Sequence, residues 1–99
     1  MKVLELREVI VQEITLVLRN KVGLHARPAS LFVRTANKFK CKITVSKDDK
    51  EVDAKSILSV LSLGAEQGDA VTIKTQGEDE VEALEALKAL IESNFGEEG

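Results

Sequence analysis

The chain has 99 residues, of which 43% are hydrophobic, 31% are charged and 3% are aromatic. A chain of this length folds as one domain and can bury its own core. The net charge of -3 argues against a nucleic-acid binder, and the scarcity of aromatic side chains nearly excludes a platform for stacking bases. The charge is unevenly divided, because residues 1–50 sum to +6 (11 basic, 5 acidic) and residues 51–99 to -9 (3 basic, 12 acidic).

The compartment is indicated by one cysteine and by what the N-terminal region lacks. Cys41 is the only cysteine, which excludes a disulfide framework within the chain and a cysteine-based zinc site and favours a reducing compartment. The apolar stretch 9–18 is broken by Gln12 and Glu13 and is far shorter than the about 20 residues of a membrane span. We therefore expect a cytoplasmic protein with no signal peptide and no membrane association.

The first half of the chain predicts a strand, a helix and a hairpin. We treat residues 1–10 as an extension of unknown role before a single domain at 11–99. Apolar side chains at every second position predict a strand at 11–19. A helix is predicted at 26–38, where apolar residues recur every three or four positions and Pro28 lies in the first turn. Short strands at 42–46 and 51–53 flank a polar turn, which is typical of a hairpin.

The second half predicts a short helix, a strand and a long helix. Ser56 offers an N-cap oxygen before a helix at 57–63, which Gly64 ends. A strand is predicted at 70–75. In the last helix Asp79 and Glu82 predict a capping box at the start and Gly96 a stop. Its buried stripe is predicted to hold Val81, Leu84, Leu87, Ile91 and Phe95.

The element order βαββαβα contains two βαβ halves. It predicts an α+β fold, an open-faced two-layer sandwich in which a four-stranded antiparallel sheet carries three helices on one face.

Several kinds of chemistry are excluded by missing motifs. The chain has no GxxxxGK[ST] loop, no GxGxxG after a strand and no HExxH, so no nucleotide cofactor and no metal are expected. The sole histidine, His25, has no acidic residue near it in sequence that could form a nucleophile and base pair, which argues against a hydrolase.

A turn at Gly23 delivers His25 to the start of the helix predicted at 26–38, two residues before Arg27. The free N–H groups of a first helical turn and the positive end of the helix dipole attract a dianion. Arg27 adds a permanent forked charge. The same positive field disfavours the imidazolium form, so the imidazole keeps a lone pair for attack on phosphorus. A lone histidine at a helix start is otherwise a cap or a surface residue, and that reading stays open.

The segment Gly23-Leu24-His25-Ala26-Arg27-Pro28-Ala29 resembles the active-site signature of the HPr family, the phosphocarriers of the bacterial phosphoenolpyruvate-dependent sugar phosphotransferase system. The resemblance extends from about Val11 to about Phe95. It includes a second motif at 54–64, AKSILSVLSLG, which is similar to the regulatory serine region of the family.

The resemblance implies that His25 accepts a phosphoryl group on Nδ1 from phosphorylated enzyme I and passes it to a IIA domain of a sugar permease. Arg27 would steady the phosphate. The protein would be a carrier with no turnover of its own, and so not an enzyme, and we expect a monomer. In the family neither metal nor cofactor is bound.

Ser56 resembles the residue that HPr kinase/phosphorylase modifies in low-GC Gram-positive and related bacteria, after which the protein acts as corepressor with the catabolite regulator CcpA. A phosphate at a helix N-cap lies in a favourable dipole. The alternative is a plain N-cap serine, worth about 1 kcal/mol, and both roles stay open.

The apolar residues of 57–63 spread over more than half of the helical wheel, so one face cannot bury them all. If Val60 and Leu63 point inward, Leu58 and Leu61 lie near the surface with Ile57 on the border, as an apolar patch of the docking kind. The alternative is that Leu58 and Leu61 are core residues. In the family this patch, together with residues matching Ser30 and Arg34, meets enzyme I, the IIA domains and the regulators.

Two rival functions remain. One is a nitrogen-type or regulatory HPr paralogue. The presence of His25 argues against a purely regulatory protein, and the Ile57-Leu58 pair favours the sugar system over the nitrogen-type one. The other is a non-catalytic split βαβ interaction domain, which would leave His25 and Arg27 unexplained.

Overall fold

The computed structural model describes residues 11–97, and their elements follow the predicted order. The strands are β1 (Gln12–Val17), β2 (Lys42–Lys47), β3 (Lys50–Asp53) and β4 (Ala70–Gln76). The helices are α2 (Ala26–Ala36), α3 (Ile57–Ser62) and α4 (Glu80–Glu92), followed by a 3-10 turn at Asn94–Gly96. Each predicted element exists, and about half of the predicted ends are displaced by one or two residues. The extension at 1–10 lies outside the described residues.

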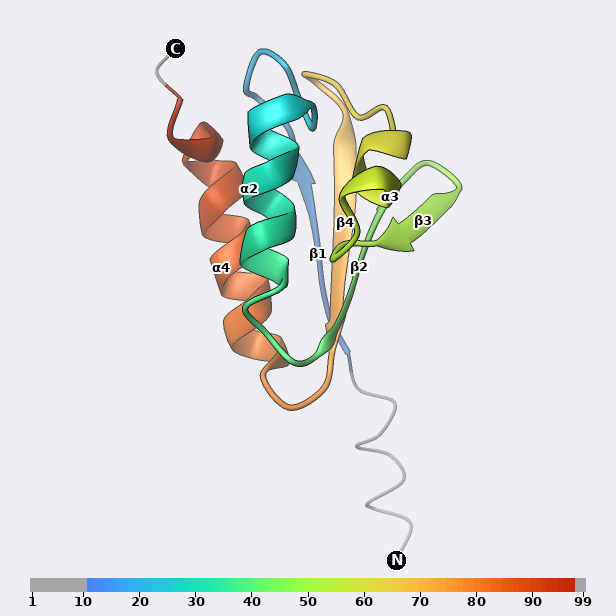
Figure 1. Cartoon of the computed structure of the whole chain (residues 1–99), viewed down its shortest axis with the longest axis vertical. Helices are drawn as coiled ribbons and strands as arrows, with labels where there is room; N and C mark the ends of the chain where they lie inside the picture. The colour runs from blue at the N-terminus through green and yellow to red at the C-terminus, as the bar shows by residue number, and fades with distance from the viewer. Residues whose placement is uncertain (1–10, 98–99) are drawn as a thin grey trace, which may run out of the picture.

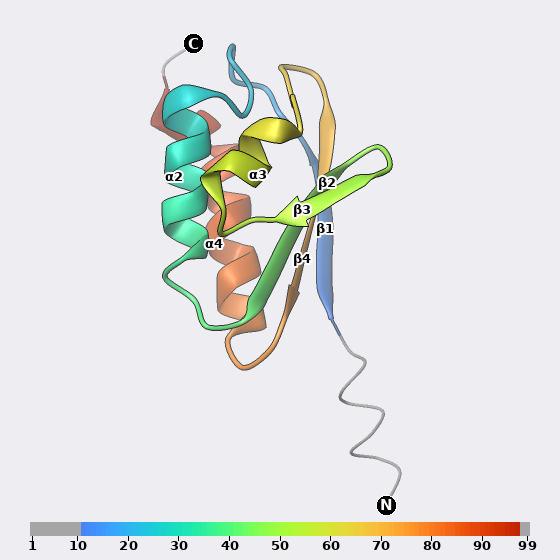
Figure 2. The same cartoon turned by 45° about the vertical axis from the view of Figure 1, so that its right-hand side comes forward.

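The four strands form one antiparallel sheet in the order β1-β4-β2-β3. In the β1–β4 pair Gln12 lies opposite Thr75 and Val17 opposite Ala70, so β1 ends at the edge of the sheet where β4 begins. All helices lie on one face of this sheet, and the other face is left uncovered (Figures 1 and 2). The predicted open-faced sandwich is therefore confirmed.

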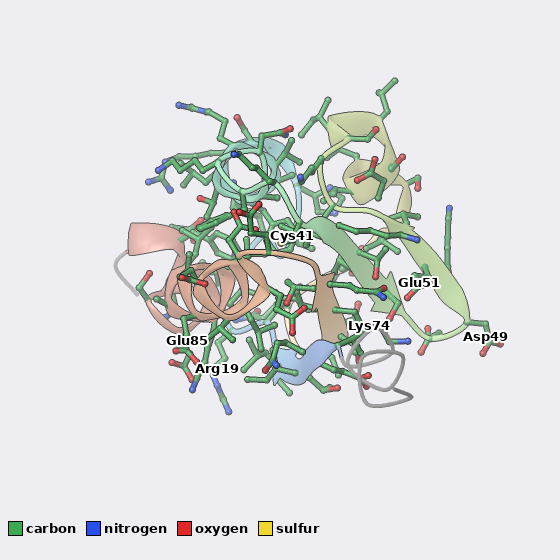
Figure 3. All side chains as sticks on the ribbon, turned by 90° about the horizontal axis from the view of Figure 1, so that it is seen from below. Arg19, Cys41, Asp49, Glu51, Lys74 and Glu85 are labelled. Atoms are coloured by element: carbon green, nitrogen blue, oxygen red, sulfur yellow. The ribbon has the colours of Figure 1, made fainter. Side chains whose placement is uncertain are left out.

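The core lies between the sheet and its helices and is mainly aliphatic, as the composition predicts. Its centre combines Phe32 of α2, Val45 of β2, Ile73 of β4 and Leu87 of α4, each with no exposed surface. The uncovered face of the sheet is polar instead. There Lys74 Nζ lies 3.6 Å from Glu51 Oε2, and Asp49 stands at the tip of the β2–β3 hairpin (Figure 3).

The predicted capping box at the start of α4 is wrong. The Asp79 carboxylate makes no cap hydrogen bond and instead accepts from the N–H groups of Lys40 and Cys41, both at 2.9 Å. These bonds, the one from Lys40 foremost, hold the pKa of Asp79 below its ordinary value. Glu80 rather than Glu82 reaches back, since its Oε1 accepts from Gly77 N at 2.8 Å. Asp79 thus ties the segment entering β2 to the start of α4.

The buried stripe of the last helix is shorter than predicted at both ends. Val81 is 53% exposed, because it is turned about 120° around the helix from the fully buried Leu87. α4 ends at Glu92, and Phe95 follows in a left-handed conformation with φ 57°. Phe95 is nevertheless buried, so it closes the core from the turn after the helix and not from the helix itself. Gly96 lies beyond the end of α4.

Candidate functional site

The candidate site forms where two loops meet at the end of the sheet. The β1–α2 loop (residues 18–25) and the α3–β4 loop (residues 63–69) run side by side at the same end of the molecule (Figures 1 and 2). Leu18 N donates to Asp69 O at 2.9 Å, and Gly68 N donates to Leu18 O at 2.8 Å. The antiparallel register of β1 and β4 continues through these bonds and brings the loops together.

At Gly23 the backbones of the two loops pass too close together to leave room for a side chain. Its φ is +62°, and a side chain at this position would collide with the carbonyl oxygen of Ala65 and stand 2.6 Å from the Cα of Glu66. The next residue, Leu24, is fully buried and donates its N–H to Ala65 O at 2.9 Å. Only glycine fits between the loops. The backbone is therefore held in place by the α3–β4 loop up to the residue before His25.

His25 is the N-cap residue of α2, with φ -122° and ψ 160°. Its exposed side chain makes no cap hydrogen bond, so the imidazole does not use up the free N–H groups of the first helical turn. Ala26 follows at φ 44°, a left-handed conformation that is strained for a residue with a side chain. The histidine therefore lies at the positive end of α2, next to a residue with a strained backbone conformation.

An open pocket of about 470 Å³ lies beside His25. It is lined by residues of both loops: Lys21, Val22, His25, Glu66 and Gln67. The pocket thus carries one basic and one acidic side chain next to the imidazole.

Arg27 projects from the first turn of α2 and is exposed. A Cβ placed on Gly96 would stand 3.8 Å from Arg27 Nη2, so the guanidinium lies over the turn that follows α4. Arg27 is not among the residues that line the pocket. His25 and Arg27 thus lie at the same helix start, and the guanidinium group of Arg27 lies next to Gly96.

Asp69 holds the α3–β4 loop in shape. Its carboxylate accepts from Glu66 N at 2.8 Å and pairs with Lys47 Nζ at 3.1 Å. The hydrogen bond from Glu66, followed by the interaction with Lys47, lowers the pKa of Asp69. Lys47 also donates to Gly64 O at 3.3 Å. The α3–β4 loop next to His25 is therefore stabilised by the ion pair of Asp69 and Lys47.

Ser56 is the N-cap of α3, as predicted, and its Oγ accepts from Ser59 N at 3.3 Å. Gly64, with φ 60°, follows the last residues of this helix. The end of α2 is tied to the same region, because Asn37 Nδ2 donates to Lys55 O at 3.1 Å. Ser56 is partly exposed, so its hydroxyl is open to solvent on one side.

The short helix α3 divides its apolar residues as the helical wheel predicts, except at Leu61, which is predicted to lie near the surface and is half-buried. Val60 has no exposed surface and Leu63 has 7%, whereas Leu58 is 77% and Ile57 39% exposed. Leu61 is half-buried and packs on the edge of the core. We call Ser30, Arg34, Ile57, Leu58 and Leu61 the docking patch. Its α2 members, half-buried Ser30 and exposed Arg34, lie on a helix that packs against α3.

Residues 11–97 carry neither a cluster of metal ligands nor a membrane-spanning helix. In that part of the chain no three His, Cys, Asp or Glu side chains are grouped as metal ligands would be. Nor does it contain a helix with the length and apolar character needed to cross a bilayer.

Sequence reasoning missed the contribution of the α3–β4 loop. Ala65, Glu66 and Asp69 reach the site through backbone contacts, and Gln67 Nε2 donates to Arg19 O at 3.0 Å. The antiparallel pairing of the first and last strands is a signal that could have found them, because it places the residues before β4 opposite those after β1.

Comparisons with known proteins agree on one family. Residues 12–93 match the family described as "PTS HPr component phosphorylation site". The chain is 53% identical over 72 residues to the HPr-like protein Crh of Halalkalibacterium halodurans, covering 73% of this chain and 86% of that protein. It is 46% identical over 84 residues to the phosphocarrier protein HPr of Mycoplasma pneumoniae, covering 84% and 96%.

Solved structures give the same answer. The crystal structure of HPr-C-His from Thermoanaerobacter tengcongensis has a TM-score of 0.88 and 56% identity, covering 89% of this chain and 99% of that chain. That of HPr from Bacillus anthracis has a TM-score of 0.79 and 46% identity, covering 82% and 96%. The chain therefore belongs to the HPr family of the phosphotransferase system, whose members are phosphocarrier proteins and not enzymes.

Proposed function

We propose that this protein accepts a phosphoryl group from phosphorylated enzyme I on His25 and passes it to IIA domains of sugar permeases. The observation that carries the proposal is the geometry of His25. Its exposed imidazole stands at the N-terminus of α2 without capping it. A nucleophile and a site for the phosphoryl charge thus coincide in one place.

In the transfer step the lone pair on Nδ1 of His25 attacks phosphorus. The new nitrogen–phosphorus bond forms as the bond to the donor group of enzyme I breaks, and the electron pair of that bond stays with the donor. The free N–H groups of the first turn of α2 meet the charge on the phosphoryl oxygens. Arg27 leaves Gly96 and adds its forked charge to the phosphate. The same step in reverse, with a IIA domain as acceptor, discharges the carrier.

The test is to incubate the protein with enzyme I and labelled phosphoenolpyruvate. We expect one label that is labile in acid and stable in base, as a phosphohistidine is, and that a sugar-specific IIA domain removes. His25→Ala is expected to abolish the label. A label that survives His25→Ala, or none on the wild-type protein, would refute the proposal.

We propose that Ser56 is a second, regulatory phosphorylation site for HPr kinase/phosphorylase. The support is its position as the N-cap of α3 with a partly exposed hydroxyl. A phosphate there stays in the favourable end of the helix dipole. With ATP and the kinase we expect an acid-stable product that Ser56→Ala abolishes. Ser62→Ala, on an exposed serine of the same helix, is the matched control and should leave the product unchanged.

A second candidate role, regulation of catabolite repression with CcpA, is favoured by the 53% identity to Crh. Crh of Bacillus subtilis is described as a catabolite repression HPr. The presence of His25 argues that such a role accompanies phosphoryl transfer and does not replace it. Binding of CcpA to the Ser56-phosphorylated protein, and not to the unmodified one, is the discriminating measurement. A nitrogen-type relay would instead show discharge only to a nitrogen-type IIA domain.

We propose that the working unit is a cytoplasmic monomer made of the domain at 11–99, preceded by residues 1–10 as an extension of unknown role. Crh of Bacillus subtilis has been described as a swapped dimer, and an HPr dimer from Thermoanaerobacter tengcongensis has been crystallised. Light scattering during size exclusion decides the oligomeric state. Removal of residues 1–10 is expected to leave labelling by enzyme I unchanged.

A further inference from the structure

Asn20 lies in the β1–α2 loop, five residues before His25, and is only 3% exposed. Its side-chain Nδ2 donates to Gly23 O at 2.9 Å, and its own carbonyl oxygen accepts from Gly23 N at 3.3 Å. One residue thus holds both polar backbone groups of the glycine that separates the two loops.

The side-chain bond of Asn20 acts on one particular peptide unit. The carbonyl of Gly23 belongs to the same peptide plane as the N–H of Leu24, which donates to Ala65 O at 2.9 Å. This plane is therefore held at its oxygen by Asn20 and at its N–H by Ala65. It cannot rotate without losing a buried hydrogen bond, and the residue that follows Leu24 is His25.

The other half of the Asn20 amide contributes nothing to stability. Its Oδ1 is buried and has no hydrogen-bond partner among residues 11–97. A buried acceptor without a donor costs free energy. The role of the side chain is therefore carried by its N–H donor, which aims at Gly23 O.

We infer that Asn20 is a positioning residue for phosphoryl transfer, whose side-chain amide fixes the Gly23–Leu24 peptide and so the place of the His25 imidazole. This inference rests on the proposed function of His25 as phosphoacceptor. The rival is that Asn20 merely adds stability, as any buried hydrogen bond does. The two differ in what happens to the transfer rate when stability is lost elsewhere.

Asn37, the C-cap residue of α2, provides a control at the end of that helix opposite His25. It is an asparagine whose Nδ2 also donates to backbone carbonyls, to Val33 O at 2.9 Å and to Lys55 O at 3.1 Å. Asn37→Ala removes two amide-to-carbonyl hydrogen bonds of the same chemical kind, at a more exposed position and far from His25 along α2.

The experiment measures kcat and KM for labelling by enzyme I, with the carrier as the varied substrate. Asn20→Asp keeps the shape but at about pH 8 places a carboxylate against Gly23 O, so kcat should fall about tenfold or more while KM stays within about twofold. The deficit should shrink toward about pH 6 as the buried carboxyl gains a proton that it can donate. Asn20→Ala should show a similar deficit without that recovery, and Asn37→Ala should keep the wild-type kcat.

Each rate is taken relative to wild type at the same pH. His25 itself, Lys21 and Glu66 beside it and Asp69 with its partner Lys47 are present in every variant, so their titration cancels to first order. Amide hydrogen exchange of Leu24 is followed in parallel. It should accelerate in both Asn20 variants and not in Asn37→Ala.

The outcomes separate the inference from the proposed function. If wild-type protein is not labelled, the proposed function fails, and unchanged exchange at Leu24 in Asn20→Asp would then overturn the positioning inference as well. If wild type is labelled and Asn20→Asp keeps its kcat at about pH 8, the inference alone is overturned. Equal losses of kcat in Asn37→Ala and Asn20→Ala would also overturn it, in favour of a purely structural role.

Discussion

The N–H of Leu24 donates to the carbonyl oxygen of Ala65 across 2.9 Å, and this bond fastens the residue before His25 to a loop that follows α3. The His25 motif is contiguous in sequence, but its backbone is held by residues about forty positions away. Changes in the α3–β4 loop should therefore be felt at the histidine, even where they do not touch it.

Replacement of Gly23 tests the close approach of the two loops. Gly23→Ala adds a Cβ that meets Ala65 O and Glu66 Cα, in a backbone conformation that alanine adopts only with strain. Gly64→Ala is the matched control, because Gly64 has a φ of 60° against 62° and open space around its Cβ position. We expect Gly23→Ala to lower the free energy of unfolding by about 2 kcal/mol more than Gly64→Ala does. Urea denaturation measures both, and equal losses would contradict the close approach.

The pair of Asp69 and Lys47 predicts a particular acid response. Because the folded state lowers the pKa of Asp69, its stabilising contribution is present above the unfolded value of about 3.9 and is lost as pH falls through the folded one. Asp69→Asn should therefore flatten the loss of stability between about pH 5 and about pH 2. Asp49→Asn, which removes an exposed carboxylate at the hairpin tip, is the control for the loss of one negative charge (Figure 3). Parallel acid curves for wild type and Asp69→Asn would contradict the assignment.

The features predicted correctly from sequence are those set by near neighbours along the chain. His25 before a helix start, Ser56 as an N-cap and the outward position of Leu58 each follow from a few adjacent residues. The capping box failed because Asp79 met stronger competition from the N–H groups of Lys40 and Cys41, which lie some forty residues earlier.

The same reason hid the hydrogen bonds that place the histidine. Asn20 is an ordinary polar loop residue in the sequence, and its task depends on where Gly23 and Ala65 meet in space. Helical periodicity likewise could not show that Phe95 closes the core from a left-handed turn beyond the end of α4. Sequence thus placed the histidine at a helix start but did not reveal the contacts that hold its backbone.

Cys41 predicts a loss of stability in alkali. Burial, together with a hydrogen bond from its side chain to Asp79 and the charge of that carboxylate, raises the pKa of its thiol to about 11. The neutral thiol therefore favours the folded state, and this contribution is lost as pH rises from the unfolded value of about 8.5 toward the folded one. The free energy of unfolding should decline above about pH 8.5 by up to about 1.4 kcal/mol per pH unit.

The chain suits this measurement because it contains no tyrosine, whose phenol would ionise in the same alkaline range. Cys41→Ala should be less stable at neutral pH but should show a flatter profile up to about pH 9.5. Native Cys41, with 3% of its surface exposed, should also resist alkylation until the protein unfolds. Identical alkaline slopes for the two proteins would exclude the thiol as their cause.

The division of charge along the chain predicts a salt-dependent encounter with enzyme I. The basic first half supplies Lys21 and Arg27 near His25 and Arg34 in the last turn of α2, while α4 carries Glu80, Glu82, Glu85 and Glu92. Association with enzyme I should slow as salt rises from about 0.05 to about 0.5 M, because the Debye length shortens to a few ångströms. Stopped-flow mixing measures the association rate at each salt concentration. Arg34→Gln should make the rate less sensitive to salt. An association rate of the wild-type protein that does not change with ionic strength would contradict the prediction.

Leu58 offers the sharpest test of the docking patch, because it is 77% exposed and gives little to the core. Leu58→Ser should change the free energy of unfolding by less than about 0.5 kcal/mol and still weaken binding to enzyme I by roughly tenfold. Val81→Ser is the matched control: Val81 is 53% exposed on the first turn of α4, at the end of the molecule opposite the start of α2 (Figure 1). Calorimetric titration with enzyme I compares the two. If both variants bind as wild type does, the exposed leucine is a surface residue without a partner; if Val81→Ser weakens binding as much as Leu58→Ser, the contact does not lie on α3.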